Sequence, residues 1–369
     1  MSSGIPAAIA ALLVAVAPGC SSDDDRPGSG GAAQASAASS SATVGSVGSG
    51  ASGSSTGSGG ANGGAGGEGQ AGAGRGGGGG AGGGPGGGGS GGGAAGGGGA
   101  GGGASFRIRI VTANTTTGNQ QSYDPGEGIR IFQGLDPDIV MIQEFRYGDN
   151  SAVALQQFVD TTFGPGFEYY RESTVNVLNA IPNGVISRFP ILSAGSWDDP
   201  VVDNRSFVWA QIDVPGPLDL WAVSVHFATA SESVRNDEAL SLVATATPLL
   251  PPADLLVVGG DLNTDVRTEA CVTTLAQLIL TTGPYPEDQL ANGNTSTNRN
   301  KPYDWLLADA DLEPFAVPLV IGQSVYPQGL VFDSRVYNPL AEVAPVQLAD
   351  SGAVNMQHMA VARDFVLPR

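Results

Sequence analysis

The stretch 254-DLLVVGGDLNTD-265 decides the fold, because it joins a buried strand to a polar turn in an unusual order. The apolar run 255-LLVV-258 predicts a strand that is covered on both faces, as in sheets that lie between other layers. Two glycines follow, and Asp261 and Asn263 then present a carboxylate and an amide. Ligands in layered α/β proteins gather where strands end, so this turn is a candidate binding point.

In the sequence on either side of this stretch, apolar residues recur in some segments every two residues and in others about every 3.6 residues. Strands are predicted at 106–115, 139–145, 206–214, 218–227, 254–260 and 359–367, and helices at 125–135, 151–163, 231–250 and 269–280. Ser231 is the expected cap of the third helix. Strands first alternate with helices, and then two strands join through 215-PGP-217. This mixture predicts the α/β class, as a four-layer sandwich of two mixed β-sheets flanked by helices.

The N-terminal part differs in composition from the rest of the chain. The apolar segment 5-IPAAIAALLVAVAPGC-20 is too short to span a membrane. Residues 1–20 resemble a bacterial lipoprotein signal segment, which implies that a lipid is attached to Cys20. The alternative is a plain secretory signal that is cut nearby. Both interpretations predict export, to the outer membrane or cell surface as a lipoprotein, or otherwise as a secreted or periplasmic protein.

Residues 21–104 are mostly Gly, Ser and Ala, as in 76-GGGGGAGGGPGGGG-89. Such a segment cannot bury enough apolar surface to offset the entropy of ordering, so we expect a disordered linker. Its typical reach is on the order of 50 Å, which suits a tether between a membrane and a domain. We expect residues 105–369 to form one globular, monomeric domain with a sizeable core.

Charge and cysteine content narrow the function further. The formal net charge of −19 predicts weak nonspecific binding to nucleic acid, because an acidic surface repels polyphosphate. The chain has two cysteines, Cys20 and Cys271. Their settings argue against a disulfide, since Cys20 ends the signal segment and Cys271 lies in a helical, apolar run. We interpret Cys271 as a small core residue.

Polar side chains occur repeatedly at the ends of the predicted strands. Both histidines of the chain are among these residues, which are Asn114, Glu144, His226, Asp261, Asn263, Asp304 and His358. The five other members all offer oxygen atoms, which are the ligands that Mg²⁺, Mn²⁺ or Ca²⁺ prefer. A zinc site is disfavoured because nitrogen and sulfur ligands are too few. Mg²⁺ is therefore the expected cofactor, with Mn²⁺ or Ca²⁺ as alternatives.

These residues belong to motifs that occur in order along residues 105–369. They are 112-TAN-114, 142-IQE-144, 184-GVISRFPI-191, 224-SVHF-227, 259-GGDLN-263, 303-YDWLL-307 and 358-HMAVARDF-365. In this order they resemble the endonuclease/exonuclease/phosphatase superfamily, whose fold is that of DNase I. The resemblance implies a DNase I-like sandwich and a hydrolase that cleaves phosphate esters with a divalent cation.

The resemblance also implies roles for single residues. Asn114 and Glu144 match the amide and the carboxylate of the metal site. Asp261 matches the aspartate that positions or deprotonates the attacking water, and Asn263 binds the phosphoryl group or orients that water. On this interpretation Gly259 and Gly260 let the backbone turn closely past bound phosphate.

The two histidines have different implied roles. His226 matches the histidine of the branch that contains DNase I, sphingomyelinases and inositol-phosphate phosphatases. Asp304 matches the carboxylate that holds the last histidine, His358, and favours its charged form. Arg205 is a further candidate for binding phosphate. One position departs from the family pattern, because Gln357 stands where an aspartate usually precedes the final histidine.

The expected function is an exported, metal-dependent phosphoesterase in which an activated water hydrolyses a phosphodiester or a phosphomonoester. The substrate is a nucleic acid, a phospholipid headgroup or a small phosphate ester, so a nuclease or a sphingomyelinase-like phosphodiesterase is compatible. Gln357 favours one alternative, a catalytically silent binding domain of the same fold at the cell surface. A structural surface protein, a third hypothesis, rests only on the glycine tract.

Overall fold

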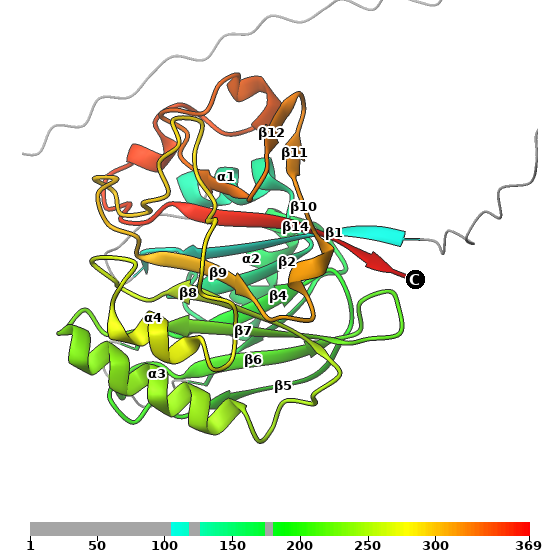
Figure 1. Ribbon diagram of the computed structural model, residues 1–369. Helices are drawn as coiled ribbons and strands as arrows, with labels where there is room; N and C mark the ends of the chain where they lie inside the picture. The colour runs from blue at the N-terminus through cyan, green and yellow to red at the C-terminus, as the bar shows by residue number, and fades with distance from the viewer. Residues whose placement is uncertain (1–104, 118–125, 174–179) are drawn as a thin grey trace, which may run out of the picture. The chain divides into compact units, whose positions relative to one another are not determined.

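The computed structural model describes residues 105–117, 126–173 and 180–369. The predicted signal segment and linker, with Cys20, lie outside the described residues. Within them, two β-sheets face each other and carry helices on their outer sides (Figure 1). The predicted two-sheet architecture is confirmed.

The larger sheet has seven strands in the order β10-β14-β1-β2-β4-β3, and β13 also pairs with β14. Strands β1 and β2 are parallel, and the other pairs are antiparallel. The bounds are β1 Ser105–Asn114, β2 Ile139–Gln143, β3 Glu168–Arg171, β4 Gly184–Ser187, β10 Ala316–Val317, β13 Leu330–Phe332 and β14 Ala360–Pro368.

The smaller sheet has five strands in the order β5-β6-β7-β8-β9, with β7 and β8 parallel. Its bounds are β5 Ile191–Trp197, β6 Phe207–Ile212, β7 Leu220–His226, β8 Leu255–Asp261 and β9 Asp304–Ala308. A separate hairpin consists of β11 Leu319–Ile321 and β12 Ser324–Tyr326. The larger and the smaller sheet each contain parallel and antiparallel strand pairs, as predicted.

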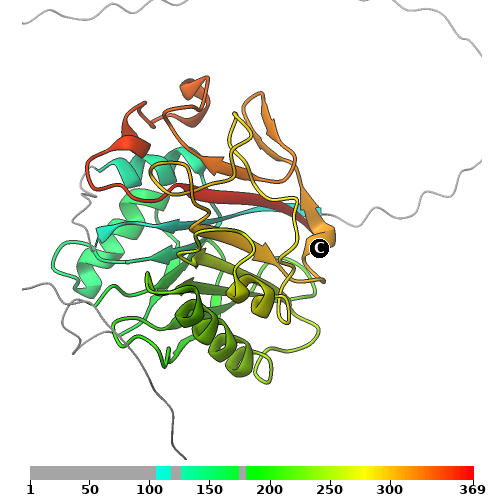
Figure 2. The same ribbon diagram turned by 60° about the vertical axis from the view of Figure 1, so that its left-hand side comes forward.

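Helices cover the outer faces of both sheets. Helices α1 (Glu127–Leu135) and α2 (Ala152–Phe163) belong to the core cluster of the larger sheet. Helices α3 (Glu232–Ala246) and α4 (Ala270–Leu275) lie together along the smaller sheet in both views (Figures 1 and 2), and Cys271 is buried there. Short 3-10 helices occur at Glu313–Phe315, Leu340–Val343 and Asp350–Gly352.

Side chains of the smaller sheet alternate between its two faces. On β8, Leu255 and Val257 face the core between the sheets, whereas Leu256 and Val258 face α3 and α4. Strands β7 and β9 alternate in the same way. Every one of these positions is buried, which explains the unbroken apolar run in the sequence.

Some local predictions were wrong. The third and fourth helices end at Ala246 and Leu275, earlier than predicted. Ser231 is the N-cap residue of the third helix, as predicted, although its side chain makes no capping bond. No helix of the described part is long and apolar enough to cross a membrane.

The interpretation of the two glycines is corrected by their place inside β8. A Cβ atom on Gly259 would lie 2.3 Å from the methyl carbon of Met141 in the opposite sheet. A Cβ atom on Gly260 would lie 1.9 Å from the carbonyl oxygen of Val225 on β7. These glycines lie inside the strand and not in a turn, and they are needed where protein layers and strands approach each other.

Candidate active site

Strand register places three polar residues in one row across the smaller sheet. His226 pairs directly with Asp261, and Asp261 pairs with Asp304. Because side chains alternate along each strand, all three lie on the face of the smaller sheet that points toward the larger sheet. Further along the strands, the residues on this face are apolar. The site is thus the polar end of the core between the sheets.

The larger sheet supplies the opposite wall of this end. Asn114 ends β1, Glu144 follows β2, and His358 precedes β14. Glu144 has a positive φ of 56°, which is uncommon for a residue with a side chain. The hydroxyl of Thr115 donates to the carbonyl oxygens of Gln143 (2.8 Å) and Glu144 (3.1 Å), and holds this turn.

Asp261 lies at the centre of the site and is 1% exposed. Its Oδ2 atom is 3.0 Å from Nδ2 of Asn114, 3.4 Å from Nε2 of His226 and 3.5 Å from Nε2 of His358. Its Oδ1 atom accepts the backbone N–H of Asn263 at 2.8 Å. Burial raises the pKa of Asp261 to about 7, although the charge of His358 opposes this rise.

The surroundings shift the pKa values of the two histidines in opposite directions. Burial opposes a charge on His358, but Asp304 and Asp261 outweigh it and raise its pKa to about 9. The Nδ1 atom of His358 is 3.0 Å from Oδ2 of Asp304. Burial lowers the pKa of His226 well below its ordinary value, and the charges of Arg205 and His358 lower it further. At neutral pH the site therefore holds one imidazolium and one neutral imidazole.

The two asparagines mainly position other groups. Asn114 donates from Nδ2 to Asp261 and, at 3.3 Å, to Glu144, while its oxygen accepts the backbone N–H of Thr116 at 2.8 Å. The oxygen that the resemblance assigns to a metal is thus used by the backbone. Asn263 donates from Nδ2 to the carbonyl of Phe227 at 2.9 Å and lines the pocket described below.

Arg205 does not line the pocket but lies behind it. Its Nε atom donates to the carbonyl of His226 at 2.5 Å, and a terminal nitrogen donates to the carbonyl of Phe227 at 2.9 Å. Its guanidinium therefore fixes the chain that follows β7. The expected contact of Arg205 with phosphate is therefore not supported. Arg205 instead positions His226.

The residues fit a hard divalent cation. The carboxylates of Glu144 and Asp261 are both buried and both lie against the Asn114 amide. A second grouping, Asp261, Asp304 and His358, offers ligand atoms within 4.8 Å of one another. We favour the first pair, because His358 is protonated at neutral pH and is hydrogen-bonded to Asp304.

A cavity of about 390 Å³ opens above these groups. Sequence reasoning missed much of its wall, which comes from an irregular loop before β9 and from one residue after β7. Its lining includes Thr229, Ser296, Thr297, Asn298, Asn300, Lys301 and Tyr303, together with Gln357. The asparagine-rich stretch 292-NGNTSTNRNK-301, directly before 303-YDW-305, was the available signal.

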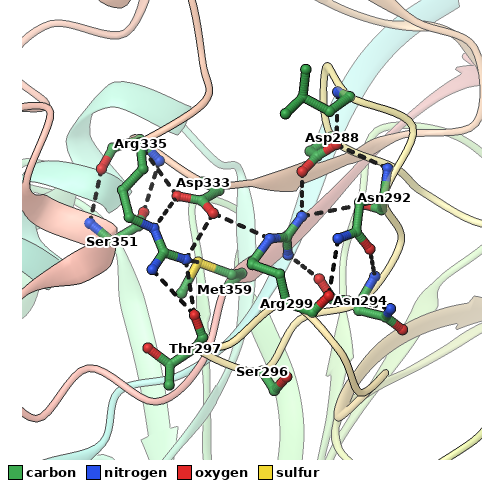
Figure 3. A network of polar contacts seen from close by, with 12 residues as sticks. Asp288, Asn292, Asn294, Ser296, Thr297, Arg299, Asp333, Arg335, Ser351 and Met359 are labelled. Carbon is green, nitrogen blue, oxygen red and sulfur yellow. Dashed lines mark hydrogen bonds and ion pairs between the residues drawn. The ribbon is translucent and has the colours of Figure 1, made fainter.

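Two arginines hold this loop in place (Figure 3). Both bind the buried carboxylate of Asp333: Arg335 at 2.8 Å and Arg299 at 3.1 Å. Arg335 donates to the carbonyl of Thr297 at 3.1 Å from each terminal nitrogen. Arg299 also bonds the carbonyl oxygen of Asn294 and pairs with Asp288. The wall of the cavity is therefore fixed without regular secondary structure.

Comparison with known families gives one match. The model of the Endonuclease/Exonuclease/phosphatase family matches residues 121–329, which is more than half of the chain. The matched range includes Glu144, His226, Asp261 and Asp304, and it ends before Gln357 and His358.

Several solved structures resemble the chain at low sequence identity. An endonuclease/exonuclease/phosphatase family protein from Leptotrichia buccalis is 15% identical, with 70% of this chain and 99% of that chain covered and a TM-score of 0.49. Proteins described as endonuclease/exonuclease/phosphatase from Bacteroides vulgatus (14%, 72% and 100%, 0.47) and Beutenbergia cavernae (17%, 71% and 72%, 0.48) are similar to it as well. Comparison with curated proteins finds no match.

Proposed function

The chain belongs to the Endonuclease/Exonuclease/phosphatase family, and on that premise we propose that it hydrolyses phosphate esters, with phosphodiesters as the preferred class. One observation carries this proposal. A single buried carboxylate, Asp261, lies within 3.5 Å of two imidazoles and beside a second carboxylate, Glu144. Hydrolysis by an activated water needs such a base next to groups that receive charge.

Asp261, His358 and His226 have different roles in the proposed reaction. Asp261 accepts the proton of the attacking water, and the Asn263 N–H keeps its Oδ1 atom in place. His358 is protonated on both ring nitrogens, and its Nδ1 atom is hydrogen-bonded to Asp304. Its Nε2–H group can therefore donate to an oxygen of the phosphoryl group. His226, which is neutral, places its Nε2 atom 3.4 Å from Oδ2 of Asp261.

We propose Glu144 and Asp261 as the holders of the cation, with Mg²⁺ as the ion and Mn²⁺ or Ca²⁺ as substitutes. When bound, the cation neutralises negative charge on the phosphoryl oxygens. Asn114 keeps the two carboxylates at one point by donating to both.

Hydrolysis of bis-p-nitrophenyl phosphate tests the proposal. We expect turnover with Mg²⁺ or Mn²⁺ and its loss on chelation, and we expect Asp261→Asn to lower kcat by at least about a thousandfold. Asp265→Asn is the matched control, because Asp265 is exposed, belongs to the same loop and does not line the pocket. Ligand binding without any turnover would instead support the catalytically silent domain.

We further propose that the enzyme is exported and attached to a membrane by a lipid on Cys20, with residues 21–104 as the linker. The apolar segment that ends at Cys20 supports this proposal. In a bacterial host, Cys20→Ser should move the protein from the membrane fraction to the soluble fraction. An unchanged distribution between the fractions would contradict the lipid anchor.

A further inference from the structure

Lys301 is the only lysine of the chain, and it lies in the wall of the cavity. Among the described residues that line the wall there is no arginine, so Lys301 is the one of them with a permanent positive charge. The chain as a whole carries a net charge of −19 and repels anions at long range. Besides the imidazolium of His358, Lys301 is therefore the cation that can affect which anions enter the cavity.

The backbone of Lys301 is fixed although its side chain is partly exposed. Its carbonyl accepts the backbone N–H groups of Thr295 (2.9 Å) and Ser296 (3.0 Å), and its own N–H donates to Oγ of Ser296 at 3.1 Å. The neighbouring Arg299 is bound to Asp333. The base of the side chain is thus held in one place in the cavity wall, while its ammonium group pairs with Asp265.

The present partner of Lys301 is easily exchanged. Its Nζ atom is 2.5 Å from Oδ1 of Asp265, and these side chains are 40% and 57% exposed. Ion pairs at such exposure contribute little to stability, because water competes for both charges. A phosphate group offers several oxygen acceptors and more charge than one carboxylate, so it can displace Asp265.

In the proposed function the phosphoryl group that reacts lies elsewhere, at His358 and at the cation that Glu144 and Asp261 would hold. The cavity wall also offers neutral hydroxyls and amides, such as those of Ser296, Thr297 and Asn300. We propose that Lys301 recognises a second anionic group, so that the enzyme selects phosphate esters that carry another phosphate beside the bond that is cleaved. This inference rests on the proposed function and deepens it.

A matched pair of substrates tests the selection. One is the p-nitrophenyl ester of thymidine monophosphate, and the other is the same compound with a second phosphate on the sugar. We expect Lys301→Met to raise KM roughly tenfold for the second compound and less than about twofold for the first. Lys301→Arg should keep most of the preference, because it keeps the charge. An equal change of KM for both substrates would overturn the inference.

Asp265→Asn separates anion recognition from the surface ion pair. It breaks the same pair as Lys301→Met but leaves the cation, so KM for the doubly phosphorylated substrate should not rise. A tenfold rise in this variant would assign the effect to the ion pair and contradict the role of Lys301.

A binding measurement keeps the inference testable if no turnover is found. Reductive methylation with isotope-labelled methyl groups marks Lys301 and the N-terminal amine, and the Lys301→Arg variant identifies the lysine signal by its loss. The NMR signal of Lys301 should shift and saturate with thymidine bisphosphate but not with thymidine. Saturation without any hydrolysis would refute the proposed function alone, whereas a signal that does not respond would refute this inference.

Discussion

At the scale of the residue, the pairing of Asp304 with His358 determines which imidazole is charged. Asp304→Asn removes the carboxylate that is 3.0 Å from Nδ1 of His358, so the pKa of His358 should fall from about 9. We expect kcat to fall roughly a hundredfold at neutral pH with the fold unchanged. NMR of the imidazole signals checks the pKa, because the chain has only two histidines. An unchanged pKa would show that Asp304 does not control this charge.

Single residues of the site could be predicted because polar side chains at strand ends are conspicuous beside apolar runs. Register then brought His226, Asp261 and Asp304 together. The uses of Arg205 and of the Asn114 oxygen could not be predicted, since both depend on backbone groups that only the folded chain brings near.

At the scale of the element, Gly260 is required by the neighbouring strand. Gly260→Ala places a Cβ atom 1.9 Å from the carbonyl oxygen of Val225, so β7 and β8 must separate. We expect a loss of roughly 3 kcal/mol or more in the free energy of unfolding. Gly164→Ala is the control for backbone strain alone, because its φ is +97° and no atom lies within 4 Å of the added carbon; it should cost about 1 kcal/mol. Equal losses in urea unfolding would contradict the crowding argument.

The arginine pair predicts a second effect at this scale. Asp333→Asn weakens the hold on Arg299 and Arg335, so the loop that they fix should become mobile and KM should rise several-fold. Faster trypsin cleavage after Arg299 measures this mobility directly.

The control for this loop variant is Asp364→Asn. Asp364 is equally buried and binds Arg107 and Arg109, but it lies in β14. Fast cleavage after Arg299 in both variants would indicate general destabilisation and not a loop effect.

The elements that could be predicted were those with a clear apolar period. Strands β6, β7 and β8 were found to within a few residues. Strands β3, β4 and β10 to β13 were missed because each has only two to four residues, which is too short for a period to be read. Strand β5 is longer but was also missed, since most of its residues are only partly buried and show no clear alternation. The loop before β9 has no period at all, and charged side chains from distant segments hold its shape.

At the scale of the whole molecule, stability should depend on pH through a buried acid. Glu238 is 0% exposed, and burial and the nearby Asp199 raise its pKa to about 8. Because its pKa is higher in the folded state, its contribution to stability is complete below about pH 4.5 and is lost as the pH rises to about 8. Glu238→Gln imitates the protonated form and should stabilise the protein at about pH 9 by on the order of a few kcal/mol.

Urea unfolding at about pH 5 and about pH 9 measures this difference. Asp237→Asn is the control, because Asp237 is exposed on the same helix. A stabilisation by Glu238→Gln that is the same at both pH values would exclude titration of Glu238 as the cause.

The alternation along β7, β8 and β9 has a consequence for how this protein can evolve. Inserting one residue into β8 before Asp261 would turn that carboxylate toward α3 and α4. The length of β8 therefore cannot change by one residue without removing Asp261 from the site. The loop at 292–301 is less restricted in length, since side-chain contacts and a few backbone hydrogen bonds hold it instead of a ladder of strands. New substrate preferences can therefore arise there by insertion or deletion while the residues of the proposed active site are inherited unchanged.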